Sequence, residues 1–502
     1  MDKARQVARL ERRLKHIIAE SIQQENYEKA LAGINACAQL LYLWNQKYID
    51  EELERYIEEI SKKVVQINLG QDTDRNTDTD RNTVLFYDGF GLDTRGLALI
   101  YLKAIAQLGY KIIYLVPQKS KGGQSDIHRI LDGCNVEWIY YSENSYLNRI
   151  KTITSTFDTF KPSVAFFYSM PDDVAAAVAF FAYAGLMTRF QINLTDHAYW
   201  LGTNIFDFCI EFRDYGASIS YYYRGIPREK LIKLPYYPYY DKEKNFEGFP
   251  FESKNKKIIF SGGALYKTLG DSENTYYKVL DQLLTSNSDV IFLYAGSGDS
   301  TELDKMATKF SQRVYHVNER KDLYQVMQRC TFYLNTYPML GGLMTQYAVA
   351  AGKVPLTMVR KGDVAEGILI EQEKREIEYF DSDSLIQDAN KLLNDEEYLH
   401  DRECKLIGSI ISEKEFKEEL QSIIRKNNTK YTIRLKKYDV NEFAKEYKQR
   451  FDYDSVISGC IAKKCNLVLI YVFPKLFIKK IIKKIIKKII KKLEEVFIWG
   501  KR

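Results

Sequence analysis

The sequence of 502 residues has few cysteines, and they follow no metal-binding pattern. Its seven cysteines are scattered, without a CxxC pair or a zinc-like spacing. The first residues, Met1-Asp-Lys-Ala-Arg, lack the apolar core of a signal peptide. These absences predict a reduced, cytoplasmic protein without a metal site.

A strong excess of one charge is also absent from most of the chain. The net charge is +6, from 73 Lys and Arg against 67 Asp and Glu, and most of the excess lies at the C-terminus. We therefore expect the body of the protein to bind no nucleic acid. The length predicts two or three domains, and a hydrophobic fraction of 45% is enough for ordinary buried cores.

Residues 1–66 have the pattern of an N-terminal helical bundle. Leu10, Leu14 and Ile18 recur at helical spacing among Arg and Lys. We expect the bundle to cap the next domain, with partner docking as the alternative. Residues 67–83 contain a duplicated polar run and predict a linker; its aspartates suggest calcium, but the glycine and closing glutamate of an EF-hand loop are missing.

From Val84 the pattern alternates between apolar strands and helices. A first set covers 84–240, a polar interdomain linker covers 241–256, and a second set covers 257–425. Apolar strands joined by helical crossovers predict parallel, doubly wound sheets. The expected fold class is therefore α/β with two Rossmann-like domains, whose ligands bind beyond the carboxyl ends of the strands.

One stretch near the middle of the chain has the residues of an anion site. A strand ends at Tyr337-Pro338, a paired-glycine turn follows at Gly341-Gly342, and a small-residue helix ends at Gly352. Glycines allow a ligand close to the backbone, and the free amides and dipole of a helix start favour an anion. The alternative is a tight turn that only connects strand to helix.

This order, completed by Gly352-Lys-Val-Pro355-Leu, resembles the donor-nucleotide segment of GT-B glycosyltransferases. It is most similar to the paired-glycine variant of the O-GlcNAc transferase and HMW1C-like group, and more distantly to the retaining group that includes glycogen synthase. The chain departs from the pattern at Gln346 and Tyr347, where those enzymes usually carry a carboxylate. An amide can make similar hydrogen bonds without the charge.

The resemblance implies a set of site residues on both domains. Those expected to hold the donor are Gly262, Gly263, Lys267, Val317, Gly341, Gly342, Leu343, Met344, Thr345 and Gln346; Gly89 and Gly91 are expected where acceptor and donor phosphates bind. Lys267 would neutralise the diphosphate, or is a solvated loop lysine. Val317 would contact the base through its main chain.

Three residues are candidates for catalysis. His197 follows a buried strand and would contact the sugar or phosphate, or is structural. Asp196 would be an acid or base, or a turn cap. Glu366 would contact the donor sugar, or lies on the surface. No DxD motif typical of metal-dependent GT-A enzymes organises the sheet, and Asp78-Thr-Asp80 falls in the polar linker, so we expect no metal and no cofactor besides the donor substrate.

Residues 426–502 predict a C-terminal helical extension. From Phe473 to Leu493 the chain repeats two isoleucines and two lysines, which places isoleucine on one side of a helix and lysine on the other. We expect a cationic amphipathic helix over 473–499 that lies on an anionic membrane and is too charged to span it. The alternative is docking on the protein itself or on a second copy.

These features together predict a metal-independent GT-B hexosyltransferase on the inner face of a bacterial plasma membrane. Its donor would be a nucleotide sugar, expected to be UDP-linked, and its acceptor a membrane-associated glycan or lipid-linked sugar in surface polysaccharide synthesis. Two alternatives remain open. They are a protein glycosyltransferase of the HMW1C-like kind and a non-catalytic partner of an active glycosyltransferase.

Overall fold

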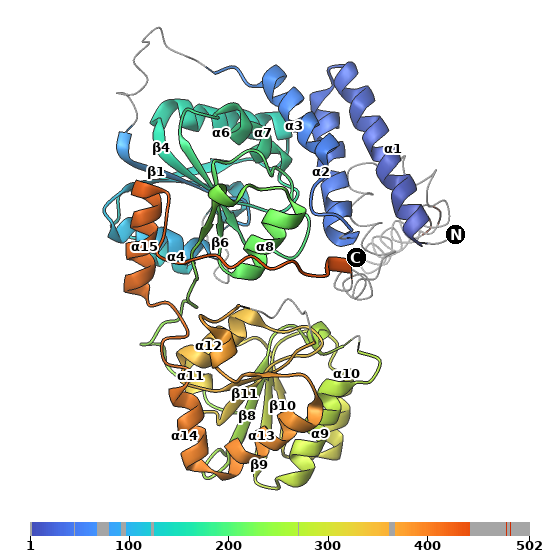
Figure 1. Cartoon of the computed structure of the whole chain (residues 1–502), viewed down its shortest axis with the longest axis vertical. Helices are drawn as coiled ribbons and strands as arrows, with labels where there is room; N and C mark the ends of the chain where they lie inside the picture. Colours follow the sequence, from blue (N-terminus) through green and yellow to red (C-terminus); the bar gives the residue numbers. More distant parts are fainter. Residues whose placement is uncertain are drawn as a thin grey trace, which may run out of the picture.

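The computed structural model describes residues 3–44, 46–67, 80–91, 97–121, 125–269, 271–360 and 367–441, with Ile478 and Ile482. These residues form two α/β domains, one above the other, and three N-terminal helices on the flank of the first domain (Figure 1). The expected two-domain α/β architecture is confirmed.

The first domain is built on a sheet of seven described strands, all parallel, in the order β3-β2-β1-β4-β5-β6-β7. The strands are β1 Asp80–Asp88, β2 Lys111–Pro117, β3 Val136–Tyr141, β4 Pro162–Tyr168, β5 Thr188–Asn193, β6 Phe208–Glu211 and β7 Leu231–Lys233. The order reverses between β1 and β4, which makes their carboxyl ends the switch point where such sheets bind ligands.

Helices cover both faces of this sheet, which explains why its strands are apolar throughout. The helices are α4 Ala98–Gln107, α5 Asp126–Leu131, α6 Tyr146–Phe160, α7 Val174–Ala182 and α8 Asp214–Tyr223, with short 3-10 turns at Gln118–Ser120 and Arg228–Lys230. α6 and α7 share a core with one face of the sheet, and α4 shares a core with the other.

The second domain repeats the design with six described parallel strands in the order β10-β9-β8-β11-β12-β13. The strands are β8 Lys257–Gly262, β9 Val290–Ala295, β10 Val314–Val317, β11 Phe332–Leu334, β12 Pro355–Met358 and β13 Glu378–Tyr379. The helices are α9 Thr275–Ser286, α10 Thr301–Lys309, α11 Leu323–Gln328, α12 Gly342–Ala350, α13 Ser382–Asn394 and α14 Glu396–Cys404, with 3-10 turns at Leu265–Thr268 and Gln372–Lys374. Its switch point lies between β8 and β11.

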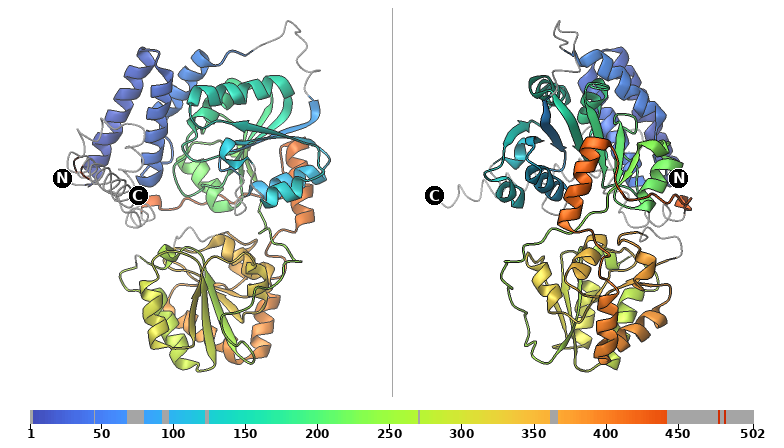
Figure 2. Two further views of the ribbon diagram at one scale, coloured as in Figure 1. Left: turned by 180° about the vertical axis from the view of Figure 1, so that it is seen from behind. Right: turned by 60° about the vertical axis from the view of Figure 1, so that its left-hand side comes forward.

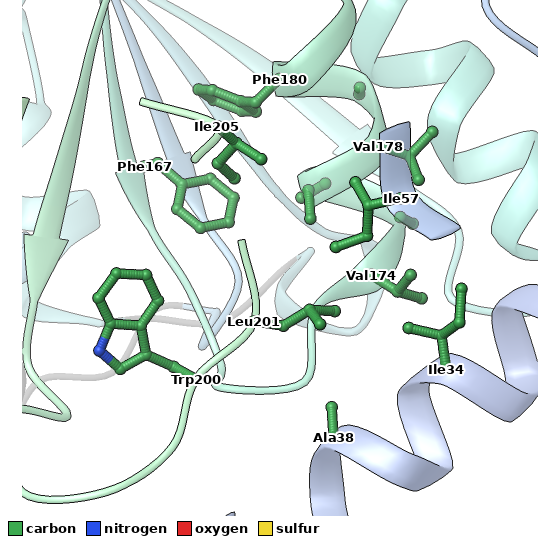
Figure 3. Close-up of a cluster of buried hydrophobic side chains, with 14 of the residues drawn as sticks. Ile34, Ala38, Ile57, Phe167, Val174, Val178, Phe180, Trp200, Leu201 and Ile205 are labelled. Atoms are coloured by element: carbon green, nitrogen blue, oxygen red, sulfur yellow. The ribbon is translucent and has the colours of Figure 1, made fainter. Parts of the chain in front are cut away.

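The N-terminal helices are α1 Lys3–Gln23, α2 Tyr27–Trp44 and α3 Glu51–Val64. Their apolar residues belong to the same buried cluster as one face of the first sheet. Figure 3 shows Ile34 of α2 and Ile57 of α3 beside Val174 and Val178 of α7. The segment is therefore a cap on the first domain, and its core is continuous with that domain.

Two expected boundaries differ from the structure at the ends of the domains. β1 begins at Asp80, inside the expected linker 67–83, because Asp80 pairs with Pro162 at the start of β4. Helix α15, Glu413–Lys426, was expected in the second domain but packs Phe416, Leu420 and Ile423 into the core beside α4 of the first. Figure 2 shows α15, in orange, alongside the first domain, after the chain has returned from the second.

The chain after α15 also differs from the expected helical extension. Residues 427–439 contain no helix and run along the first domain, where Arg434 N donates to Asp214 Oδ1 at 3.1 Å and Lys436 N to Ser218 Oγ at 3.0 Å. The expected membrane helix 473–499 lies outside the described residues, except for helical Ile478 and Ile482. No described helix is long and apolar enough to cross a bilayer.

Candidate active site

The start of α12 is fixed by Asn335, a buried residue that follows β11 directly. Its Oδ1 accepts from Gly341 N at 2.9 Å, and its Nδ2 donates to Thr345 Oγ1 at 2.9 Å and Thr357 Oγ1 at 3.2 Å. Thr345 N donates to Gly341 O and closes the first turn. Asn335 thus connects the paired-glycine turn to both α12 and β12, and sequence reasoning missed it.

The backbone amides of the first three residues of α12 point out of the helix start and donate to no described acceptor. Within the described part of the chain, no acceptor takes the amides of Gly342, Leu343 and Met344, the first three residues of α12. Gly342 packs so closely on Ile368 that an added Cβ would lie 2.9 Å from Ile368 Cδ1. The start of α12 therefore presents backbone donors and the positive end of the helix dipole, as an anion site requires, and anion binding there stays a prediction.

Lys267 lies beside this helix start. Its carbonyl accepts from Met339 N at 3.2 Å, in the loop that leads into α12. Its side chain is half-buried and has no carboxylate or hydrogen-bond partner among the described residues, and burial lowers the pKa of its ammonium group. A partly desolvated cation without a counter-charge suits a site for an anionic ligand.

The loops after β8 and β9 meet at Gly262, Gly263 and Gly296, which we call the glycine corner. A Cβ on Gly262 would lie 2.9 Å from Ala295 O, and one on Gly296 would lie 1.8 Å from Gly263 O. Gly263 has φ +124°, which favours glycine. Gly296 N donates to Val317 O at 3.0 Å, so the carbonyl expected to contact the base already bonds within the fold.

Arg360 is a second cation that the sequence did not reveal. Its Nε donates to Tyr337 Oη at 2.9 Å, and its guanidinium lies 5.4 Å from the Tyr337 ring centroid. Tyr337 precedes the loop that carries Met339 and Gly341. Arg360 and Lys267 therefore contact the same loop, which ends at the open turn of α12. A single arginine after a strand carries no motif that would have identified it.

Gln346 is in a different setting from the one expected. Its side chain is buried, and its Nε2 donates to Tyr236 O at 3.3 Å and Ile368 O at 3.2 Å. Tyr347 Oη donates to Tyr239 O, so both residues connect α12 to the chain that leaves the first domain. At the position where the resemblance implies a carboxylate, this chain uses Gln346 for contact between the domains.

Across from α12, Asp196 and His197 follow β5 of the first domain. Asp196 is buried, with Oδ2 2.6 Å from Arg213 Nε and Oδ1 3.1 Å from Nη2, while His197 Nδ1 lies 3.4 Å from its Oδ1. Burial opposes ionisation, but Arg213 and His197 together lower the pKa of Asp196. Such a carboxylate suits a positioning role better than that of an acid or base. His197 is 32% exposed and is the more accessible group.

The loop that carries His197 is fixed by two buried polar side chains, those of Arg224 and Glu54. Arg224 Nη2 donates to the carbonyls of Thr195, Asp196 and Ala198 at 3.1, 3.0 and 2.6 Å. Glu54 of α3 accepts from Gly202 N at 2.9 Å, further along the same loop. The guanidinium therefore binds the carbonyls and a carboxyl oxygen accepts from an amide, which leaves this loop little freedom.

Gly89 and Gly91 lie at the switch point of the first sheet, as expected. Asp88 Oδ1 accepts from Phe90 N and Gly91 N at 2.9 Å each, and Gly91 has φ +81°. A Cβ on Gly89 would lie 2.7 Å from Ser169 Oγ. The turn is closed on itself, and only glycine fits against β4 here.

A cavity of about 720 Å³ lies between the domains. Its first-domain wall includes Phe212 and Tyr215, on either side of Arg213 in the sequence, and its second-domain wall includes Arg360 and Ile368. The C-terminal segment supplies a third wall, from Lys430 to Tyr438. Arg360 lines the cavity directly, and Ile368 in its wall packs on Gly342 of α12, whereas Lys267, His197 and the residues of α12 are not among its lining residues. Glu366 lies outside the described residues.

Among the described residues, no three His, Cys, Asp or Glu side chains group as a metal site. Metal independence stays a prediction.

The comparisons with known proteins bear on the fold. No family model matches the sequence, and no curated protein matches it. A glycosyltransferase from Rickettsia africae ESF-5 aligns over 69% of this chain and 99% of its own, with 14% identity and a TM-score of 0.51. The chain has the GT-B fold.

Two further structures align with this GT-B chain at lower scores. A mutant of the O-GlcNAc transferase of Thermobaculum terrenum covers 89% of this chain and 82% of its own, with 11% identity and a TM-score of 0.49. The UDP co-structure of MnaA from S. aureus covers 68% and 96%, with 12% identity and a TM-score of 0.48. The alignment with the Rickettsia africae glycosyltransferase, and not these two, confirms the fold expected from the paired-glycine resemblance.

Proposed function

We propose that this protein is a glycosyltransferase that takes a sugar from a nucleotide diphosphate donor. The observation that carries the proposal is Lys267, a half-buried cation without a counter-charge among the described residues, beside the three unused amides of α12. A diphosphate would supply the missing negative charge and accept from the amides. When the sugar bond breaks, the same groups would stabilise the charge on the leaving diphosphate.

The acceptor would enter the cavity between the domains, toward His197. His197 would contact the transferred sugar, and Asp196 with Arg213 would hold the imidazole in position. The residue that takes the acceptor proton would be His197, the most exposed titratable group of this cluster. Both domains line the cavity, so their closure on the substrates would exclude water that could otherwise hydrolyse the donor.

A membrane-associated acceptor fits the course of the C-terminal segment. Residues 430–438 line the cavity, and the isoleucine-lysine repeat follows on the same chain. We propose that this repeat holds the protein on an anionic membrane, next to a glycan or lipid-linked acceptor. Deleting 473–502 should lower partition onto phosphatidylserine vesicles at least tenfold; unchanged sedimentation with the vesicles would refute the attachment.

The transferase proposal is tested by release of the nucleotide. Purified protein is incubated with a panel of nucleotide sugars, UDP-linked first, with membrane lipid extract as the acceptor source. Lys267→Met should lower nucleotide release about a hundredfold or more, because a charge that stabilises the leaving group is lost. Lys278→Met, an exposed lysine of the same domain, is the matched control. No release and no nucleotide binding with any donor would refute the proposal.

Gln346 favours a second candidate, a non-catalytic partner of an active glycosyltransferase. The helix carboxylate is missing, and the amide in its place bonds Tyr236 and Ile368. Such a protein would bind a nucleotide without turnover. A higher melting temperature with nucleotide, combined with no nucleotide release in the assay above, would identify such a protein. Transfer of the sugar to a peptide in preference to a lipid would instead indicate a protein glycosyltransferase.

A further inference from the structure

Helix α1 exposes a row of arginines on the side of the helix that faces away from the core. Its apolar residues Val7, Leu10 and Leu14 are buried. The opposite face carries Arg5, Arg9 and Arg12, all exposed, which we call the arginine stripe. Their spacing of four and three residues places them on one face of the helix.

The stripe has no neutralising carboxylate on its own helix. Glu11, the one acidic residue in the first three turns, points to Lys15 at 3.3 Å and Lys47 at 2.6 Å. Among the described residues, no carboxylate pairs with a stripe arginine; Arg12 Nε donates only to Ala8 O, at 3.4 Å.. The first turn of α1 contains no acidic residue, so the positive end of the helix dipole adds to the charge.

The stripe lies beside the place where the C-terminal segment leaves the described structure. Tyr438 packs with Tyr48 in one cluster, and Lys47 next to Tyr48 pairs with Glu11 of α1. Figures 1 and 2 show the N-terminal end of α1 and the end of that segment on the same side of the first domain. The described C-terminal segment therefore ends on the stripe's side of the molecule.

Exposed aromatic side chains border the same place. Tyr221 and Tyr222 of α8 are 40% and 41% exposed, and the next residue, Tyr223, donates to Tyr438 O. Tyrosine is typical of surfaces where an apolar phase meets water. Ile478 and Ile482 of the repeat lie one helical turn apart and are 56% and 51% exposed.

We infer that the arginine stripe of α1 is a second membrane contact, which binds the headgroups of an anionic bilayer in addition to the contact proposed for the C-terminal repeat. Positive charge alone would also fit a nucleic acid, but the exposed Tyr221 and Tyr222 near the end of the C-terminal segment favour a lipid surface. Two contacts instead of one would fix how the first domain is oriented on the membrane. The inference concerns membrane binding alone and does not depend on sugar transfer.

Vesicle partition of the full chain tests the inference. A variant with Arg5→Gln, Arg9→Gln and Arg12→Gln should bind phosphatidylserine vesicles about a hundredfold more weakly than the natural chain, from the usual contribution of each basic residue near an anionic surface. The control changes three exposed lysines of the second domain to glutamine, namely Lys254, Lys256 and Lys321. This control should bind within threefold of the natural chain.

The inference would be overturned if the natural chain and the stripe variant bound vesicles equally, or if the control lost as much binding as the stripe variant. It would also be overturned if the natural chain did not bind anionic vesicles. Binding to single-stranded RNA that depends on the stripe, without vesicle binding that depends on it, would have the same consequence. Hydrogen exchange of the natural chain gives a readout free of folding effects. Amides of 5–12 should exchange more slowly on phosphatidylserine vesicles than on phosphatidylcholine vesicles, and equal rates would also overturn the inference.

Discussion

Arg213 and Asp196 form a buried bidentate ion pair that connects the two sides of the candidate site. The Nε–Oδ2 distance is 2.6 Å and the Nη2–Oδ1 distance is 3.1 Å. On one side His197 approaches Asp196, and on the other a Cβ on Gly367 of the second domain would lie 3.4 Å from Arg213 Cβ. The pair thus links the exposed histidine to the contact between the domains.

Removing one partner of this pair should be costly. Arg213→Met leaves the Asp196 carboxylate buried without its cation, and the free energy of unfolding should fall by about 3–5 kcal/mol at pH 7. Because the folded-state pKa of Asp196 is lowered, the pair stabilises the protein above pH 4, and this contribution is lost as the pH falls below it. Denaturant unfolding at several pH values measures both effects.

The exposed Arg228→Met is the control for Arg213→Met and should change stability by less than about 0.5 kcal/mol. Asp196→Asn combined with Arg213→Met should cost less than the sum of the single changes, because neither charge is then buried alone. Additive costs would show that the two side chains do not depend on each other.

Glu54 should give the protein a stability change near neutral pH. Burial raises the pKa of its carboxyl to about 7 in the folded protein, above its ordinary value of 4.5. The folded state then binds more protons than the unfolded state, so stability falls as the pH rises from 4.5 to 7. The expected loss is about 3 kcal/mol.

Glu54→Gln should remove this loss of stability between pH 4.5 and 7. The difference in unfolding free energy between the natural chain and the variant should therefore change with pH only in that range. Glu59→Gln, exposed on the same helix, is the control and should show no such step. A constant difference at all pH values would contradict the raised pKa.

Lys267 should affect stability in opposite directions with and without a ligand. Its folded-state pKa is lowered, so the unfolded state binds more protons, and stability should rise with pH as the ammonium group deprotonates. At pH 7 Lys267→Met should melt at the same or a higher temperature than the natural chain. With saturating UDP the order should reverse, because the lost cation weakens ligand binding.

Lys256→Met, on an exposed lysine, should leave both melting temperatures unchanged. If Lys267→Met lowers the melting temperature without ligand, or leaves the stabilisation by UDP unchanged, Lys267 does not serve an anion site.

Gly296→Ala should disturb the glycine corner. The new Cβ would lie 1.8 Å from Gly263 O, a backbone atom that no side-chain rotation can move away. We expect a loss of about 1–3 kcal/mol in stability and a weaker response to UDP, because Gly263 precedes the Lys267 loop. Ser297→Ala, next in sequence with an exposed hydroxyl group, should have little effect. Equal effects of both changes would exclude this close packing as the cause.

The sequence by itself determined the elements whose signals are local. Apolar runs and helical periods depend on neighbouring residues, so the strands from Val84 and from Lys257 were predictable, as was the turn at Gly341-Gly342. The backbone freedom of a glycine is a property of that one residue, so a turn that needs it can be predicted from the sequence. The resemblance in this stretch was sufficient for the fold.

The tertiary structure decided which charges and amides have partners. Asp196 and Arg213, Glu54 and Gly202, and Gln346 and Tyr236 are far apart in the sequence, and no spacing connects them. The same applies to α15, whose apolar stripe could cover either domain. A buried polar group must find a partner wherever the fold brings one, and that choice depends on the packed core as a whole and not on any local pattern.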